Sequence, residues 1–346
     1  MAGRAASRGV GLRDVLQEGV PPVGLGVLFL VAVASAVAAA SAATGASSQV
    51  MLKAAGASFP ETIYNKWFSA VSNKGIKVNY KATGSGTGVK LFTAGAVDFG
   101  ASDNAMDGAA VKKVGRGVVQ IPMVGGAVAV VYKKNCNLQL TQSQLARVFL
   151  GTIRNWSALG CPAGPIKVVY RSDSSGTTAS FTTSLLAFSE LWKKVGAGKT
   201  VKWPVGVGKD GSSGVALFVK ANVGSISYVS FGKAKSEGLQ TAGLENKKGN
   251  VVQLTSKTMV AGLSQVKLDA ENRGADPNPA GDDSYPIVSY TWVLAYATGN
   301  KKLSALRDTF SYMLSPVAQA MANGLGFVQL PEKVRMLSIK AVQSLK

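Results

Sequence analysis

The sequence has 346 residues, of which 47% are hydrophobic and 16% are charged, and its formal net charge is +20. This length and composition exclude wholesale disorder and suffice for two ordinary domains with buried cores. The absence of histidine from the sequence rules out His-based catalytic triads, histidine metal sites and imidazole acid–base catalysis.

The N-terminal segment has the pattern of a secretory signal peptide. Three arginines precede an uncharged, alanine-rich run over Val23–Ala46 that ends in small residues, with cleavage expected near Ala43 or Ala46. The run is also long enough to span a bilayer, so an uncleaved anchor is a second interpretation. We assign residues 1–46 to this leader and expect a periplasmic or otherwise extracytoplasmic location.

Downstream of the leader, β-rich runs alternate with amphipathic helical patterns. Runs rich in Val, Ile and Tyr predict strands over Ile76–Thr83, Val118–Tyr132, Ile166–Arg171, Gly224–Phe231 and Ile287–Ala297. Apolar residues at spacings of three and four predict helices over residues 60–71, 140–151 and 178–195, and again in the tail after residue 301. The polar stretch between residues 269 and 286 is expected to be a loop. This alternation predicts an α/β architecture in which helices cover the sheets.

The two cysteines, Cys136 and Cys161, fit no metal-binding motif. In an exported protein they can form one disulfide, which would stabilise the fold by about 3 kcal/mol. The alternative is a pair of reduced, inert thiols.

The positive charge suggests attraction of anions. The lysines are scattered singly and in pairs, without an arginine-rich arm, a basic helix or a zinc-finger spacing. We therefore expect no nucleic-acid binding. Small anionic ligands and anionic surfaces remain as candidate partners.

Three segments place small and hydroxyl residues where a helix is expected to begin: GASFPETIY with Ser58, TGSGTGVKLF with Ser85, and DSSGTTASF. A helix N-terminus exposes unpaired N–H groups and a partial positive charge, which together suit an oxyanion. Taken alone, each segment is better explained as an N-cap or a turn.

Two charged residues accompany the third helix start. Arg171 ends a predicted strand just before it, where a guanidinium can bind an oxyanion through two parallel hydrogen bonds. Asp173 would hold that guanidinium in place. The alternatives are a surface arginine and a carboxylate that stabilises the helix start.

Asp103, in DFGASDNAMD, is unexpected beside an anion because a carboxylate repels negative charge. It fits an anion that carries a proton, since a phosphate P–OH can donate to a carboxylate and fully ionised sulfate cannot. A ligand without that proton leaves the carboxylate unpaired, which can discriminate by several kcal/mol. The alternative is a solvated turn residue.

Together, these motifs resemble the extracytoplasmic phosphate-binding proteins of Pst-type ABC transporters, the PstS family. The resemblance runs in order along nearly the whole chain after the leader, through AAGASFPETIYNKWF, NYKATGSGTGVKLFTAGAVDFGASDNAM, QIPMVGGAVAVVY, IKVVYRSDSSGTTASF and VKWPVGVGKDGSSGVALFVK. It implies the class II periplasmic-binding-protein fold, with two α/β lobes, two crossover strands and the ligand in the cleft. The strong positive charge departs from the usual family pattern.

The resemblance also implies a ligand set. The implied phosphate-binding residues are Ser58, Phe59, Ser85, Asp103, Arg171, Ser175, Gly176 and Thr177. In this set Asp103 accepts the phosphate proton, Phe59 contributes its main-chain N–H, and Asp173 braces Arg171 from behind. The remaining members supply hydroxyl and main-chain donors.

The same resemblance implies a discontinuous lobe I over residues 51–132 and 286–346, and a lobe II over residues 133–285. The crossovers are expected near Val131–Asn135 and Tyr285–Val288.

The leading hypothesis is a non-enzymatic, monomeric receptor that binds inorganic phosphate with high affinity and delivers it to an ABC permease and its ATPase. We expect no cofactor and no metal. The alternatives are a receptor for another oxyanion such as arsenate, a phosphate-binding fold used in adhesion or signalling, and a phosphatase with Asp103 as nucleophile.

Overall fold

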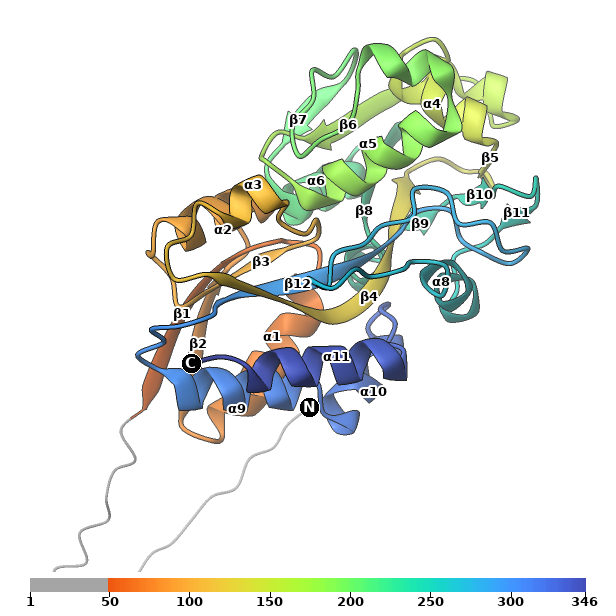
Figure 1. Ribbon diagram of the computed structural model, residues 1–346. Coiled ribbons are helices and arrows are strands. Elements are labelled where there is room, and N and C mark those ends of the chain that lie inside the picture. The colour runs from red at the N-terminus through yellow and green to blue at the C-terminus, as the bar shows by residue number, and fades with distance from the viewer. Residues whose placement is uncertain (1–48) are drawn as a thin grey trace, which may run out of the picture. The chain divides into compact units, whose positions relative to one another are not determined.

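The computed structural model describes residues 49–346, so the expected leader lies outside the described part of the chain. Across that part, no helix combines the length and apolar character that crossing a bilayer requires. The elements form the α/β architecture that the alternating patterns predict, arranged in two lobes (Figure 1).

Lobe I is built on three parallel strands and one antiparallel strand. Its strands are β1 (Val50–Gly56), β2 (Ile76–Lys81), β3 (Phe99–Ser102) and β12 (Val288–Tyr296). Its helices are α1 (Glu61–Ser72), α2 (Ser85–Thr93), α3 (Gly108–Val111), α9 (Leu303–Met313), α10 (Pro316–Gly324) and α11 (Glu332–Gln343). In Figure 1, α2 and α3 lie on one side of the sheet, and α9 and α11 lie on the other.

Lobe II contains the strands β6 (Lys167–Arg171), β7 (Val207–Lys209) and β8 (Ser225–Ser230), of which β6 runs parallel to both neighbours. Its helices are α4 (Gln142–Phe149), α5 (Gly176–Phe188), α6 (Gly211–Ala221), α7 (Phe231–Glu237) and α8 (Ser256–Leu263). A separate small sheet contains β5 (Gln139–Leu140), β10 (Gly243–Glu245) and β11 (Val251–Val252), and β9 (Gln240–Thr241) pairs with β4.

The strand β4 (Val118–Tyr132) joins the two lobes in one sheet. Its residues 118–127 pair with β12 and its residues 128–132 pair with β8. The resulting strand order is β2-β1-β3-β12-β4-β8-β6-β7. The change of partner at residue 127 comes a few residues before the expected first crossover, and β12 begins at the end of the expected second one. The division into residue ranges remains a prediction.

The predicted elements form, although one predicted helix is shorter than expected and several further elements were not predicted. The third predicted helix ends at Phe188, and a 3-10 turn over Glu190–Lys194 follows it. The helices α6, α7 and α8 were not predicted. The strands β1 and β3 were not predicted either, because β1 ends in the small residues AAG and β3, FGAS, is short and contains no β-branched residue. Small residues are required there, since a Cβ on Gly88 of α2 would lie 2.4 Å from the Cα of Gly56. The helix packs directly on the strand backbone.

Cys136 and Cys161 form a disulfide in lobe II, with their Cα atoms 5.5 Å apart. It links the segment that follows β4 to the segment that follows the 3-10 turn Trp156–Leu159. Such a link restricts the unfolded chain and so favours the folded one.

Candidate anion-binding site

Arg171 is the last residue of β6, and only 4% of it is exposed. Its Nε donates to Asp173 Oδ1 at 2.6 Å, and a terminal nitrogen of the guanidinium pairs with Asp173 Oδ2. The main-chain N–H of Gly211 also donates to Asp173 Oδ1, at 3.0 Å. The carboxylate is therefore fixed by the start of α6, and it in turn fixes the guanidinium.

Ser58, just before α1, reaches Arg171 through another serine. The Oγ atoms of Ser58 and Ser212 lie 2.8 Å apart, and Ser58 Oγ accepts the main-chain N–H of Ser212 at 3.2 Å. Arg171 donates to Ser212 Oγ at 3.1 Å. Ser212 stands at the start of α6, so a fourth helix start joins the site from lobe II.

Asp103, which follows β3, brings two further helix starts together. Ser85 Oγ, at the start of α2, lies 3.5 Å from Asp103 Oδ2 and accepts the main-chain N–H of Asp103 at 3.2 Å. Thr177 Oγ1, at the start of α5, lies 3.4 Å from the same carboxylate oxygen. One lobe supplies Ser85 and Asp103, and the other supplies Thr177.

Ser175 and Gly176, the two residues before Thr177, are also fixed by their neighbours. Ser175 Oγ accepts the N–H of Thr178 at 3.1 Å and so caps α5, while its own proton stays available for donation. A Cβ on Gly176 would lie 2.4 Å from Ser85 Oγ and 3.0 Å from the main-chain nitrogen of Asp103. Only glycine lets the start of α5 approach lobe I this closely.

The side chain of Phe59 takes no part in this polar cluster. It is buried, and its ring packs edge-on against Phe327 at a centroid distance of 5.9 Å. Any polar contribution of Phe59 therefore comes from its main chain.

The carboxyl of Asp103 is only 2% exposed, and its protonation is finely balanced. Burial raises its pKa to about 7, although hydrogen bonds from Thr291 and Thr177 and the positive charges of Arg171 and Lys199 oppose the rise. Near neutral pH this group can either accept or donate a proton within a hydrogen bond.

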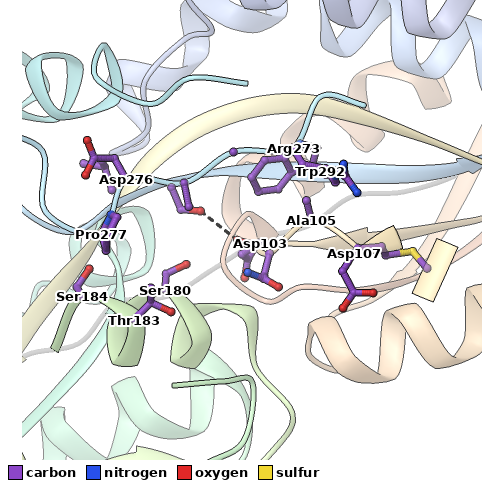
Figure 2. A pocket seen from close by; sticks show the side chains of 16 residues that line it. Asp103, Ala105, Asp107, Ser180, Thr183, Ser184, Arg273, Asp276, Pro277 and Trp292 are labelled. Atoms are coloured by element: carbon purple, nitrogen blue, oxygen red, sulfur yellow. Dashed lines mark hydrogen bonds between the residues drawn. The ribbon is translucent and has the colours of Figure 1, made fainter. Parts of the chain in front are cut away.

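A cavity of about 420 Å³ adjoins Asp103 (Figure 2). Ser180 and Thr183 of α5 line one wall, and residues 273–277 and Trp292 line the others. Tryptophan emission should therefore respond to events at Asp103. Within residues 49–346, no three His, Cys, Asp or Glu side chains are arranged to hold a metal ion.

Sequence comparisons place the chain among binding proteins. Residues 38–317 match a family model described as a PBP superfamily domain. The phosphate-binding protein PstS of Methanocaldococcus jannaschii is 33% identical over 86% of this chain and 87% of that protein. The PstS of Haemophilus influenzae is 37% identical over 81% of this chain and 89% of that protein. The chain belongs to the PstS family.

The fold agrees with that membership. A high-affinity periplasmic phosphate-binding protein, solved with bound phosphate, has a TM-score of 0.69 to this PstS-family chain. The match covers 83% of this chain and 92% of the other chain at 22% identity. At this identity, the similarity shows the fold alone. The class II periplasmic-binding-protein architecture expected from the sequence is therefore confirmed.

The polar residues nominated as ligands in this PstS-family chain lie together, with the half-buried Asp173 behind Arg171, and two further hydroxyls join them. Ser212 belongs to KDGSSG, a helix start of the same kind as the other three, so its pattern could have been noticed. Thr291 gave no local signal, because it lies in the middle of β12 and reaches Asp103 only through the pairing of β12 with β3.

Proposed function

We propose that this PstS-family protein binds inorganic phosphate outside the cytoplasmic membrane and delivers it to an ABC-type import permease. One observation carries the proposal. A buried carboxyl, Asp103, lies among hydroxyl donors and helix starts together with a single buried guanidinium, Arg171. A donor-rich site that also contains an acceptor is complementary to an anion that carries a proton.

The charges of the site suit such a ligand. The charge of Arg171 is shared with Asp173, so the site offers little net positive charge of its own. The N-termini of α1, α2, α5 and α6 supply partial charge and N–H donors instead. Asp103 accepts the P–OH proton, and sulfate has none to offer.

The proposed ligands are those that the resemblance names. They are Ser58, Phe59, Ser85, Asp103, Arg171, Ser175, Gly176 and Thr177, with Asp173 bracing Arg171. Because both lobes contribute, we infer that they close over the anion by a hinge movement at β4 and β12.

The remaining parts of the proposal rest on family membership. Relatives named as phosphate-binding proteins support binding without turnover. We propose that the protein is exported through its leader, acts as a monomer and docks on a permease with its ATPase. Arsenate shares the shape and protonation of phosphate, so the same site would admit it.

The test is a titration of the purified protein with phosphate and with sulfate, followed by tryptophan fluorescence. We expect saturable phosphate binding, and sulfate binding weaker by at least about a hundredfold. Asp103→Asn should narrow that difference, because the amide neither repels sulfate nor requires a ligand proton. Equal responses of the wild-type protein to both anions would refute the proposal.

A further inference from the structure

The two oxygens of the Asp103 carboxylate have different neighbours. Oδ2 faces Ser85 and Thr177, at the starts of α2 and α5. Oδ1 faces the opposite way, toward β12, where Thr291 Oγ1 donates to it at 3.1 Å. Only Oδ2 therefore lies on the side of the proposed anion.

Strand β12 holds Asp103 at two points. Ser289 Oγ lies 3.0 Å from the main-chain carbonyl of Asp103 and 2.8 Å from that of Tyr290, so its proton is shared between them, and Thr291 holds the side chain. The pairing of β12 with β4 shifts register between Thr291 and Trp292. Such β-bulges re-aim side chains, and this one lies at the residue that contacts the carboxylate.

The Thr291 hydroxyl is fully buried and has a single proton to donate. Two other acceptors lie near Thr291 Oγ1, the carbonyl of Ser102 at 3.5 Å and the buried hydroxyl oxygen of Tyr64, and neither carries a formal charge as Asp103 Oδ1 does. Hydrogen bonds to charged acceptors are the stronger kind. The proton of Thr291 therefore goes to Asp103, and it favours the ionised carboxylate.

We propose that Thr291 is a positioning residue for anion specificity, which engages Oδ1 so that the free acceptor of Asp103 is Oδ2. In this arrangement the carboxylate meets the bound anion as an acceptor, and an anion without a proton is rejected. The inference rests on the proposed function, and it assigns part of the selectivity to a side chain that does not touch the ligand.

The titratable groups that interact electrostatically with Asp103 are Arg171 of β6, Lys199 after the 3-10 turn Glu190–Lys194, Tyr64 of α1 and Tyr80 of β2. Three further charged residues, Asp107, Arg273 and Asp276, line the cavity beside it. Burial raises the pKa of both tyrosines far above its ordinary value, so they stay neutral at physiological pH. Arg171 and Lys199 favour the ionised carboxylate, as Thr291 does, and they remain in place when Thr291 is changed.

The test replaces Thr291 in the full chain and measures phosphate and sulfate affinities at about pH 6 and about pH 8. Thr291→Val removes the donor and keeps the shape, so Asp103 should stay protonated to higher pH and donate to sulfate. We expect the phosphate-to-sulfate affinity ratio at about pH 8 to fall by about tenfold, with phosphate affinity itself within about threefold. Thr291→Ser keeps the hydroxyl and should restore the wild-type ratio.

A purely structural role of Thr291 predicts a different result, in which the affinities for phosphate and for sulfate fall by the same factor at both pH values. That result, or an unchanged ratio in Thr291→Val, would overturn the inference. Thr291→Ala removes the same hydroxyl and carries the same expectation if the valine variant folds poorly. Failure of the wild-type protein to bind phosphate would instead refute the proposed function, so the two failures are distinguishable.

Discussion

At the scale of single residues, the most consequential group is the carboxyl of Asp103. Its folded-state pKa of about 7 lies above the ordinary value near 4. A group with a raised pKa contributes stability that is fully present below about pH 4 and is lost as the pH rises through about 7. Without a ligand, the ionised carboxyl thus destabilises the fold.

The direction of this pKa shift leads to a prediction about the stability of the protein without ligand. At about pH 8, Asp103→Asn should unfold at a higher urea concentration than the wild type. Its free energy of unfolding should be larger by about 2 kcal/mol, because the buried charge is gone. Near pH 4 the two proteins should unfold alike, since the wild-type carboxyl is then protonated. Urea titrations at both pH values check this, and a wild type that is more stable than the variant at about pH 8 would contradict it.

At the scale of elements, the site is a meeting of helix starts whose backbones approach closely. The start of α5 in lobe II lies against Ser85 and Asp103 of lobe I at Gly176. There is no room for a methyl group between them. The absence of a side chain at this position is what lets α5 approach Ser85 and Asp103 this closely.

Gly176→Ala should therefore keep lobe II intact and hinder closure. Overpacking of this kind costs about 1–3 kcal/mol, so phosphate affinity should fall by roughly tenfold to a hundredfold. The control is Gly214→Ala in the first turns of α6, where a Cβ would have its nearest neighbour at 3.8 Å. Calorimetric titration of both variants is the measurement, and equal affinities would argue against this close approach.

The sequence predicted some of these elements and missed others. Apolar periodicity predicted α1 and α4, because their buried faces repeat at the helical period, and a run rich in Val and Ile predicted the almost fully buried β4. These patterns missed β1 and β3, where close packing selects Ala and Gly over β-branched residues. In the candidate site, the hydroxyl-rich helix starts and Arg171 could be recognised from their neighbouring sequence. Thr291 could not be, because only the sheet register brings it to Asp103.

At the scale of the whole molecule, an ion pair joins α7 to α1 beside the candidate anion site. Lys233 of α7 lies 3.3 Å from Glu61 of α1, and it donates to Ser213 of α6 at 3.0 Å. The lysine side chain is 11% exposed and the glutamate 26%. The contact connects α7, which falls in lobe II of the predicted division, to the helix that follows Ser58, so it would favour the closed arrangement proposed above.

Lys233→Met should weaken phosphate binding by about threefold to fivefold, since a partly exposed pair contributes about 1 kcal/mol or less. The loss should shrink at high salt, which screens the pair. The matched control is Lys220→Met, whose partner Glu237 lies in the same lobe at 3.3 Å. The measurement is the phosphate affinity of both variants at low and at high salt. Equal changes of affinity in the two variants would count against a role of Lys233 between the lobes.

The place of β12 in the sheet has a consequence for how the chain acquires its fold. This strand separates β3 from β4, which do not pair with each other, and it comes from near the C-terminal end of the described chain. The hydrogen bond between Ser289 and Asp103 spans 186 residues of sequence. Contacts this distant form slowly, since long loops must close first. A nascent chain would thus hold most of the proposed anion-binding side chains well before it could assemble them, and the candidate site can form only after β12 has been synthesised.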